Sequence, residues 1–261
     1  MIKRRIKAFL GWLAFHSGLH RRLIGDRAIV ALFHRVDDRY GGNPISCTTR
    51  EFRGFLRFFG KFFTVITLQE LLDRIASGKS VAGCLVITFD DGYLDNHRDA
   101  APELRRQGLP ACFFIATDFI GSQRVPWWDE ELGIRSEWMS WDQVRALKSQ
   151  GFEIGAHTMN HVDLGVVKGD EAEKEIVGSG ERLHRELDAP VPFFTYPYGR
   201  PHQITEENRE LVRRAGFSCC LSAFGGTVTR RDDAFRLKRT PVSPWHISPY
   251  QFGFETMVSK S

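Results

Sequence analysis

The strongest fold signal in this chain of 261 residues is the stretch CLVITFDDG at residues 84–92. An apolar run of strand length ends at Asp90 and Asp91 and is followed at once by Gly92, which is the profile of a buried strand that stops at a tight turn. Two adjacent carboxylates repel each other and resist burial, unless a cation lies between them or one of them serves as a base. A solvated surface turn is the alternative interpretation, and we adopt it for Asp37 and Asp38, which also follow an apolar run.

Strand-like and helix-like segments alternate along the chain. Apolar strand-like runs occur at 29–36, 64–68, 84–90, 111–117, 153–157, 193–198, 217–223 and 236–242. Helix-like segments occur at 49–60, 68–77, 97–107, 140–150, 170–187 and 205–215. Capping-box patterns at Thr48 with Glu51 and at Ser140 with Gln143 mark two helix starts. The alternation predicts parallel strands covered by helices, and both an open doubly wound sheet and a closed barrel satisfy it.

A pair of histidines follows another predicted strand. His157 and His161 are four residues apart, so both imidazoles can face one ion from a single helical turn. Together with one carboxylate they form a three-ligand set, which leaves a metal position open for water. Two unrelated surface or capping histidines are the alternative. His16 and His20 have the same spacing, but no strand precedes them and we do not expect them to bind metal.

The third stretch of interest is an aromatic strand that ends at Pro197, Tyr198 and Gly199. This sequence forces a turn and exposes backbone N–H groups, one of which could face a developing oxyanion. An ordinary turn between a strand and a loop is the alternative interpretation.

Together, the three stretches resemble the motifs of the polysaccharide deacetylase family, which is carbohydrate esterase family 4. The family's Thr-Phe-Asp-Asp-Gly motif is matched in full at 88–92, and its His-Ser/Thr-x-x-His motif is matched in full at 157–161. Its Arg-x-Pro-Phe/Tyr-Gly motif is matched at 197–199. The motifs occur in the family's order, and the resemblance covers roughly residues 29–242.

The resemblance implies a fold and a set of residue roles. The expected fold is α/β, a distorted (β/α) barrel of about seven parallel strands. Asp90 resembles the family's general base, and Asp91, His157 and His161 resemble its metal ligands. The backbone N–H of Tyr198 resembles its oxyanion donor.

The chain departs from the family pattern in two places. Thr195 stands where the family often has the arginine that orients the base, so we expect Arg239 to substitute, with a surface or rim arginine as the alternative. The family motifs that supply the general acid are not recognisable. His246 and His34 are the two candidates for the acid, and a structural histidine is the alternative for each.

A tryptophan-rich interval interrupts the alternation of strands and helices. Residues 121–139 contain Trp127 and Trp128 beside a run of carboxylates, with a third tryptophan at position 138. Flat indole rings next to carboxylates suit sugar rings, so we predict that these two tryptophans bind substrate together with Pro197 and Tyr198. The alternative is that the tryptophans hold a long loop against the barrel.

These observations predict a metal-dependent hydrolase that removes N-acetyl or similar acyl groups from an amino-sugar glycan or glycolipid. Zn²⁺ is the expected ion, and Co²⁺, Ni²⁺ and Mn²⁺ also suit two nitrogens and one oxygen. The alternative is a protein of the same fold that binds carbohydrate or a lipid-linked sugar without catalysis, as the missing arginine and acid motif would suggest.

The positive charge of the chain is concentrated at its beginning. Residues 1–27 contain seven basic residues and one acidic residue, whereas the rest contains 29 basic and 31 acidic residues. This pattern argues against a nucleic-acid-binding protein. We divide the chain into a basic helical arm, 1–27, and a barrel domain, 28–261. The arm's apolar run is too short to span a bilayer, so it either packs against the barrel or lies in a membrane interface.

Cysteine usage bears on the cellular compartment. The number of cysteines is odd, and Cys84, Cys112, Cys219 and Cys220 lie in strand-like runs, while the fifth is Cys47. This placement predicts buried free thiols. We therefore expect a reducing, cytoplasmic location, with membrane association through the arm left open.

Overall fold

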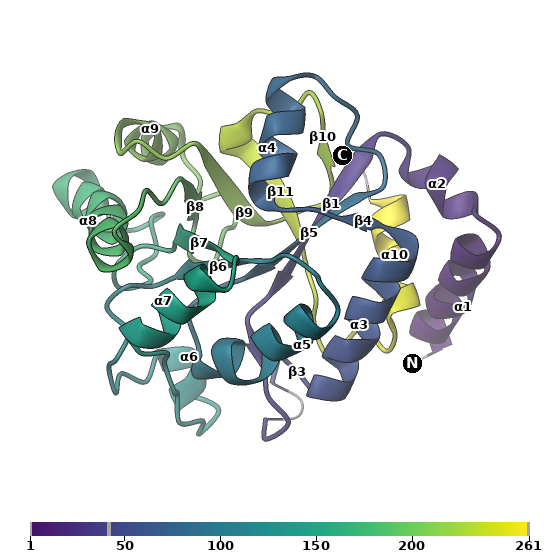
Figure 1. Ribbon diagram of the computed structural model, residues 1–261, viewed down its shortest axis with the longest axis horizontal. Coiled ribbons are helices and arrows are strands. Elements are labelled where there is room, and N and C mark those ends of the chain that lie inside the picture. Colours follow the sequence, from purple (N-terminus) through teal and green to yellow (C-terminus); the bar gives the residue numbers. More distant parts are fainter. Residues whose placement is uncertain (1, 41–42, 260–261) are drawn as a thin grey trace.

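Seven parallel strands close into a barrel in the computed structural model, which describes residues 2–40 and 43–259 (Figure 1). In spatial order they are β1 (Arg27–Phe33), β5 (Cys84–Phe89), β6 (Cys112–Ile115), β7 (Glu153–Ala156), β8 (Phe193–Thr195), β9 (Cys219–Gly225) and β11 (Leu237–Pro241). The barrel closes because β1 pairs in parallel with both β5 and β11. The predicted (β/α) barrel is therefore confirmed, and the open doubly wound sheet is excluded.

Short strands supplement the barrel. β4 (Thr64–Val65) pairs with the first residues of β5, and β10 (Val228–Thr229) pairs antiparallel with β1. β2 (Arg35–Val36) and β3 (Ser46–Cys47) form a separate parallel pair just beyond β1.

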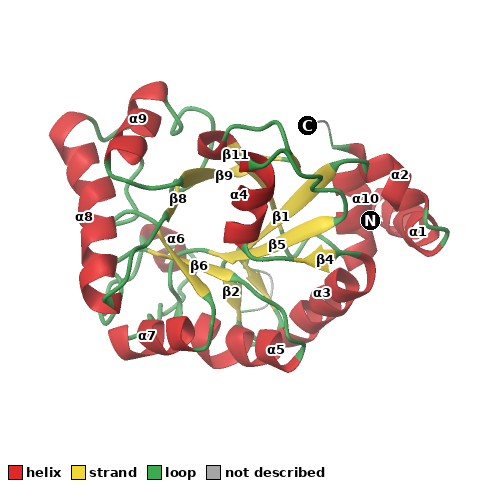
Figure 2. Cartoon of the chain, turned by 45° about the horizontal axis from the view of Figure 1, so that its top comes forward, coloured by secondary structure: helices red, strands yellow, loops and turns green. Residues whose placement is uncertain are grey.

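Helices surround the strands, as the views in Figures 1 and 2 show. The predicted helices are present as α3 (Thr49–Phe62), α4 (Leu68–Ala76), α5 (Ala101–Arg106), α7 (Trp141–Ser149), α8 (Gly169–Leu187) and α9 (Glu206–Arg214). Both expected capping boxes are formed, at the starts of α3 and α7. A π-helical turn, η1 (Asn96–Ala100), leads into α5, and a short 3-10 helix, η2 (Ala234–Arg236), precedes β11. The sequence did not predict α6 (Trp127–Glu130) or α10 (Pro249–Val258).

The beginning of the chain forms α1 (Ile2–His16) and α2 (Leu19–Ile24). Both helices pack against α10 on the outside of the barrel, on the side away from α8 and α9 (Figures 1 and 2). The division into an arm and a barrel domain stays a prediction, and its first and last residues lie outside the described part. Within the described residues, no helix is both long and apolar enough to cross a membrane.

The alternation of side chains along the strands separates two layers of core. Ile29, Ala31 and Phe33 of β1 belong to the apolar cluster that includes the surrounding helices. Val86 of β5 and Leu237 of β11 belong to a second cluster with residues of the opposite strands. Because side chains alternate along a strand, Thr88 and Asp90 share the face of Val86, and Arg239 shares the face of Leu237. The barrel therefore directs these polar side chains toward its interior.

Two smaller expectations have different outcomes. All five cysteines are buried and free, as predicted for the four that lie in strand-like runs. The interpretation of Asp37 as a solvated turn residue is wrong, because its side chain is buried and ion-paired with Arg39 and Arg98. Asp38 is exposed. The difference arises because Arg39 from the same loop and Arg98 from η1 both pair with Asp37.

Candidate active site

Asp90 follows the end of β5 and is held by an arginine from β11, which lies on the other side of β1. Both guanidinium NH₂ groups of Arg239 donate to the two carboxylate oxygens of Asp90, each at 2.7 Å. The Nε–H of Arg239 donates to the backbone oxygen of Ser222 at 2.6 Å. The backbone N–H of Asp90 donates to Phe33 at 3.0 Å, which ties this turn to β1. Arg239 is fully buried, so it is not a surface arginine.

This pairing keeps Asp90 ionised. Burial alone would raise the pKa of Asp90, but the charge of Arg239, followed by that of His157 and the hydrogen bonds from Arg239, lowers the pKa below its usual value. Bidentate pairing of this kind also fixes the plane of the carboxylate. Asp90 is therefore an oriented anion with one face available to the cavity that it lines.

Asp91 and the two histidines converge on one point. The Oδ1 atom of Asp91 lies 3.4 Å from Nε2 of His157 and 3.3 Å from Nε2 of His161. One ligand atom from each of the three residues lies within 4.8 Å of the others, and all three side chains are buried. Burial opposes ionisation of Asp91, but its contacts with the two imidazoles hold its pKa well below the usual value.

Thr195 orients the first of these imidazoles. The Nδ1 atom of His157 lies 3.0 Å from the backbone oxygen of Thr195 and 2.6 Å from its hydroxyl. An Nδ1–H that donates to the carbonyl leaves the lone pair of Nε2 directed at Asp91, which is the tautomer that a metal ligand needs. Thr195 thus supports a ligand at the position where the family often has an arginine.

Unusual backbone conformations are concentrated at this site. Of the five non-glycine residues with positive φ in the described chain, four belong to the motif turns, with values of 54° to 77°. These are Asp91, Thr158, His161 and Tyr198. Left-handed backbone costs free energy for residues with a side chain and persists where the surrounding structure enforces it. The turns are therefore built to direct side chains rather than to minimise local strain.

The donor set fits a divalent metal ion. Oδ1 of Asp91 is buried and accepts no hydrogen bond in the described structure, although a buried carboxylate oxygen ordinarily has a partner. The Oδ1 atom of Asp91 faces the Nε2 atoms of His157 and His161 and no backbone N–H group in the described structure. One oxygen and two nitrogens on three side chains match the ligands and number of a catalytic zinc site. The residues Asp91, His157 and His161 could therefore hold such an ion.

The two carboxylates and the two histidines border one cavity of about 580 Å³. Its wall includes His34, Trp127, Trp128 and Tyr198 as well as Asp90, Asp91, His157 and His161. Arg239 is not part of the wall and reaches the cavity only through Asp90. Pro197 does not line the cavity either, although its neighbour Tyr198 does.

The two candidate acids occupy different places. His246 does not line the cavity, and its ring is bound between the backbone N–H of Ser243 and the carboxylate of Glu255. His34 follows β1 and lines the cavity. Burial lowers the pKa of His34, while the negative charges of Asp91 and Asp90 oppose this effect. The geometry therefore favours His34 over His246 as a residue that can reach a bound substrate.

Tyr198 forms part of the cavity wall next to Asp91, His157 and His161. Its ring lies 4.9 Å from that of His161, and its hydroxyl accepts a hydrogen bond from Nε1 of Trp127 at 3.2 Å. The next residue, Gly199, has a φ of 58°, and a Cβ there would lie 2.2 Å from the backbone nitrogen of Ala223. Only glycine fits this close approach, which holds the turn against β9.

The tryptophans of the loop occupy two kinds of position in the structure. Trp138 is buried and stacks on Tyr93 at 4.4 Å between ring centres, so it holds the loop against the barrel. Trp127 and Trp128 line the cavity, and the ring of Trp128 lies 4.6 Å from that of His161. Trp138 therefore occupies the position expected of a residue that holds the loop against the barrel. Trp127 and Trp128 occupy the position expected of residues that contact substrate.

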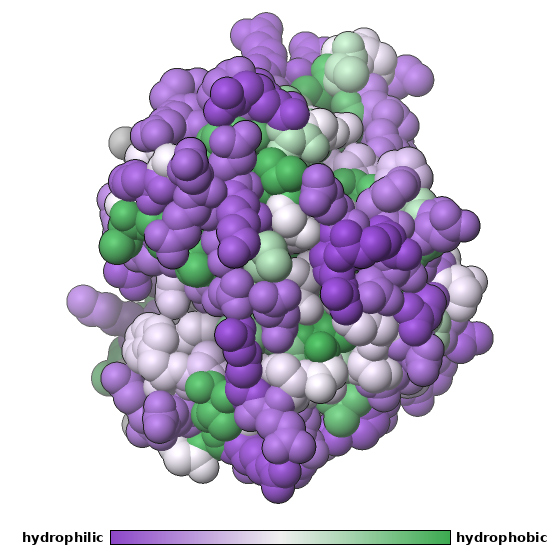
Figure 3. Space-filling model, turned by 90° about the vertical axis from the view of Figure 1, so that its left-hand side faces the viewer, coloured by the Kyte–Doolittle hydropathy of each residue, from purple (hydrophilic) through white to green (hydrophobic). Residues whose placement is uncertain are grey.

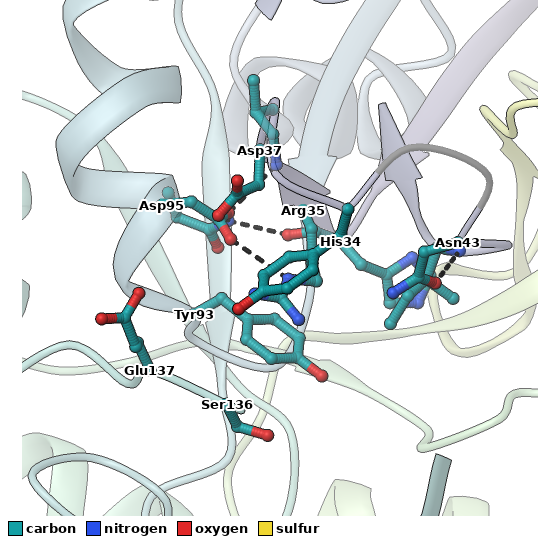
Figure 4. A network of polar contacts seen from close by, with 12 residues as sticks. His34, Arg35, Asp37, Asn43, Tyr93, Asp95, Ser136 and Glu137 are labelled. Carbon is teal, nitrogen blue, oxygen red and sulfur yellow. Dashed lines mark hydrogen bonds and ion pairs between the residues drawn. The ribbon is translucent and has the colours of Figure 1, made fainter. Parts of the chain in front are cut away.

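A buried polar network fixes the position of Trp128, and no local sequence pattern indicates it. Nε1 of Trp128 donates to the hydroxyl of Tyr93 at 2.9 Å, and that hydroxyl donates to Asp129 at 3.0 Å. Arg35 lies 3.4 Å from Asp129 and 3.2 Å from Asp95, and its guanidinium covers the ring of Tyr93. Figure 4 shows Arg35 next to His34, close to Tyr93 and Asp95. The network connects the end of β1 to the loop across 94 residues of sequence.

A closed (β/α) barrel with paired carboxylates and imidazoles at the strand ends defines a hydrolase fold with a metal-type centre. The polysaccharide deacetylase family model matches residues 77–220, which is more than half of the chain. The chain belongs to the polysaccharide deacetylase family and is an enzyme of the hydrolase class that acts on carbon–nitrogen bonds other than peptide bonds.

Individual relatives agree with this membership. A poly-beta-1,6-N-acetyl-D-glucosamine N-deacetylase of Staphylococcus epidermidis is 24% identical over 225 residues, which cover 82% of this chain and 72% of the relative. The structure of IcaB from Ammonifex degensii superposes with a TM-score of 0.73 at 23% identity, over 89% of this chain and 97% of IcaB. The Streptococcus pyogenes deacetylase PplD has the same TM-score at 19% identity, over 88% and 98% of the two chains. At these identities the two structures support the fold.

Proposed function

We propose that the protein removes N-acetyl groups from a glycan of the poly-N-acetylglucosamine type, using a divalent metal ion. The observation that carries this proposal is the convergence of Asp90, Asp91, His157 and His161 on one cavity at the ends of the barrel strands. The relatives named as poly-N-acetylglucosamine deacetylases support the choice of substrate. A glycolipid that carries the same sugar would present the same amide.

Asp91, His157 and His161 would hold the ion. When bound, the ion would act as a Lewis acid that activates water and polarises the acetyl carbonyl. Zn²⁺ is the proposed ion because it favours three protein ligands with one open position, while Co²⁺, Ni²⁺ and Mn²⁺ accept the same donors. Thr195 and Trp128 would keep the two imidazoles in place, since the first binds Nδ1 of His157 and the second packs on His161.

Asp90 would act as the general base. It accepts a proton as water attacks the acetyl carbon, and Arg239 keeps the carboxylate ionised and in a fixed plane before that step. The N–H of Tyr198 would donate to the oxyanion that forms on the acetyl oxygen. The carbon–nitrogen bond then breaks, which gives acetate and the amine of the sugar.

His34 would give the leaving nitrogen its proton, because it lines the cavity and His246 does not. A lowered pKa makes protonated His34 a stronger acid, at the cost of a smaller protonated fraction at neutral pH. Trp127 and Trp128, which line the cavity, would offer ring faces to the sugar.

The test is acetate release from an N-acetylglucosamine oligomer by the purified protein, together with its metal content. We expect activity that is lost on chelation and restored by Zn²⁺ or another divalent ion. Asp90→Asn should retain metal and lose activity by about a thousandfold, because it removes the base but no ligand. Full activity after chelation, or in Asp90→Asn, would exclude this mechanism.

One of the two arguments for a protein that binds carbohydrate without catalysis no longer applies. That alternative was based on the missing arginine and the missing acid motif, and Arg239 now supplies a guanidinium to Asp90. Binding of the oligomer to the metal-loaded protein without acetate release would favour the alternative.

A further inference from the structure

The outer face of α1 and α2 is more apolar than a solvent-exposed helix surface should be. Ile2, Ile6, Phe9 and Leu13 form a stripe along α1, with Ile2 76% exposed and Phe9 60% exposed. Leu10 and Trp12 of α1 and Leu19 and Leu23 of α2 are exposed as well. We call these eight side chains the apolar outer face. Exposed apolar residues that are scattered need no explanation, but eight of them on two consecutive helices indicate an interaction site.

The orientation of α1 is fixed by its other side. Gly11 approaches α10 so closely that a Cβ there would lie 2.0 Å from the backbone oxygen of Tyr250. Phe15 is buried among the rings of Phe58 and Phe62, and Lys7 forms an ion pair with Glu255 at 2.9 Å. The helix therefore cannot turn its apolar stripe inward without losing these contacts.

The opposite side of the molecule has a different surface. Figure 3 shows the face that carries α8 and α9, where polar side chains predominate and hydrophobic residues occur in small separate groups. The outward side of α8 is rich in charged residues of both signs, such as Glu171, Glu173 and Lys174. The apolar outer face is thus a local feature of α1 and α2 and not a general property of this surface.

Cations border the apolar outer face, and the described residues of α1 and α2 include no Asp or Glu. Lys3, Arg4 and Arg5 on α1 and Arg21 and Arg22 on α2 are exposed, and none forms an ion pair within the described residues. No Asp or Glu occurs in residues 1–25. A second copy of this chain would bring two such cationic borders together, which is unfavourable, whereas an anionic surface complements them.

We propose that the apolar outer face binds the surface of a lipid bilayer that contains anionic lipids. A 15-residue helix with apolar side chains outward and cations around them matches the pattern of helices that lie in the membrane interface. The apolar side chains enter the boundary between headgroups and acyl chains, and the cations contact lipid phosphates. This surface lies outside the catalytic cavity, and the proposal is independent of the catalytic one.

The experiment is flotation of the purified full-length chain with vesicles. The vesicles contain phosphatidylcholine alone or phosphatidylcholine with about one third phosphatidylglycerol. We expect the wild type to float with the anionic vesicles, to bind neutral vesicles much more weakly, and to lose part of its binding at high salt.

Two sets of variants separate the apolar and charged contributions. Ile6→Glu with Phe9→Glu should lower the partition coefficient about 100-fold, because two buried side chains become charged. Arg21→Gln with Arg22→Gln should lower it about tenfold on anionic vesicles and little on neutral ones. Val166→Glu is the matched control, since Val166 is 76% exposed and lies outside α1 and α2. It should bind as the wild type does.

Three results would overturn the proposal. The first is that the wild type fails to float with anionic vesicles. The second is that the Ile6→Glu/Phe9→Glu variant floats as well as the wild type does. In the third, light scattering shows a stable dimer that this variant dissolves, which would make a second copy the partner. Acetate release from a soluble oligomer should be the same in all these variants, and its loss would point to misfolding instead.

Discussion

The cavity at the strand ends and the apolar outer face depart from the usual distribution of residues in opposite ways. At the cavity, charged side chains are buried, with Arg239, Asp90 and Arg35 each at most 2% exposed. On α1, large apolar side chains are exposed, with Phe9 at 60%. Folding alone favours neither arrangement, because burying a charge and exposing an apolar surface both cost free energy.

The two regions differ in where the partners lie. Arg239 and Asp90 are partners inside the protein, and so are Arg35 and Asp95, whereas the buried Oδ1 of Asp91 accepts no hydrogen bond in the described structure and faces the proposed metal position. The side chains of the apolar outer face remain 42–76% exposed. The ion pairs of the first region are therefore satisfied within the fold, whereas we propose that the second region finds its partner outside the chain. Substitutions should affect stability strongly in the first region and weakly in the second.

The largest effect in this comparison is expected for Arg239→Met, which leaves Asp90 buried without its cation. The free energy of unfolding at neutral pH should fall by about 3–5 kcal/mol, and acetate release should fall about 100-fold. The pKa of Asp90 should rise, because burial then acts with less opposition. The acid limb of the rate profile should move to higher pH, and the loss of stability should shrink as pH falls and Asp90 becomes protonated.

Arg239→Lys is the matched control for this prediction. It keeps the charge and loses the bidentate geometry, so the acid limb should stay near that of the wild type while the rate is reduced. Denaturant titrations and rate profiles over pH measure both effects. An acid limb that does not move in Arg239→Met would mean that Arg239 does not set the pKa of Asp90.

An intermediate effect is expected for His34→Gln. Acetate release from the glycan amide should fall about 100-fold, because the amine cannot leave without a proton. Cleavage of nitrophenyl acetate should fall only about threefold, since a nitrophenolate leaves unprotonated. His202→Gln is the control, because His202 also lines the cavity but is exposed. It should change both rates little.

The ratio of the two rates decides the role of His34. A selective loss on the amide supports proton donation. An equal loss on both substrates would show that His34 maintains the shape of the cavity instead.

The repeating part of the fold could be predicted from the sequence because each element carries its own signal. β5 is buried along its whole length and reads as an unbroken apolar run, which is typical of a strand in a covered parallel sheet. α3 and α7 begin with capping boxes that are visible in the sequence. The motifs at 88–92 and 157–161 lie at strand ends, and the strand ends of a parallel barrel meet at one rim.

The parts that were missed depend on contacts between distant segments. The sequence shows that Asp129 is acidic, but nothing local indicates that Arg35, Tyr93 and Ser136 meet it. Likewise, the position of His246 away from the cavity follows from its packing with α10. That helix was itself missed because it follows a proline-rich stretch, although Ser248 and Pro249 are a usual N-cap and first residue.

The smallest expected effect on the free energy of unfolding is that of Phe9→Ala. Phe9 and Phe15 lie on opposite sides of α1, so they compare the two kinds of surface within one helix. Phe15 is 2% exposed and Phe9 is 60% exposed, so the same substitution tests both sides of one helix. Phe15→Ala should lower the free energy of unfolding by about 3–5 kcal/mol, and Phe9→Ala should change it by less than about 0.5 kcal/mol. Denaturant titrations without lipid measure both values.

The comparison depends on the Phe9→Ala result, because the two regions differ only if the apolar outer face contributes nothing to the isolated fold. A large loss of stability in Phe9→Ala would mean that part of the protein covers this face in solution. The exposed side chains would then be ordinary core residues. Unchanged stability combined with weaker vesicle binding would instead show that Phe9 contributes its free energy only when an outside partner covers it.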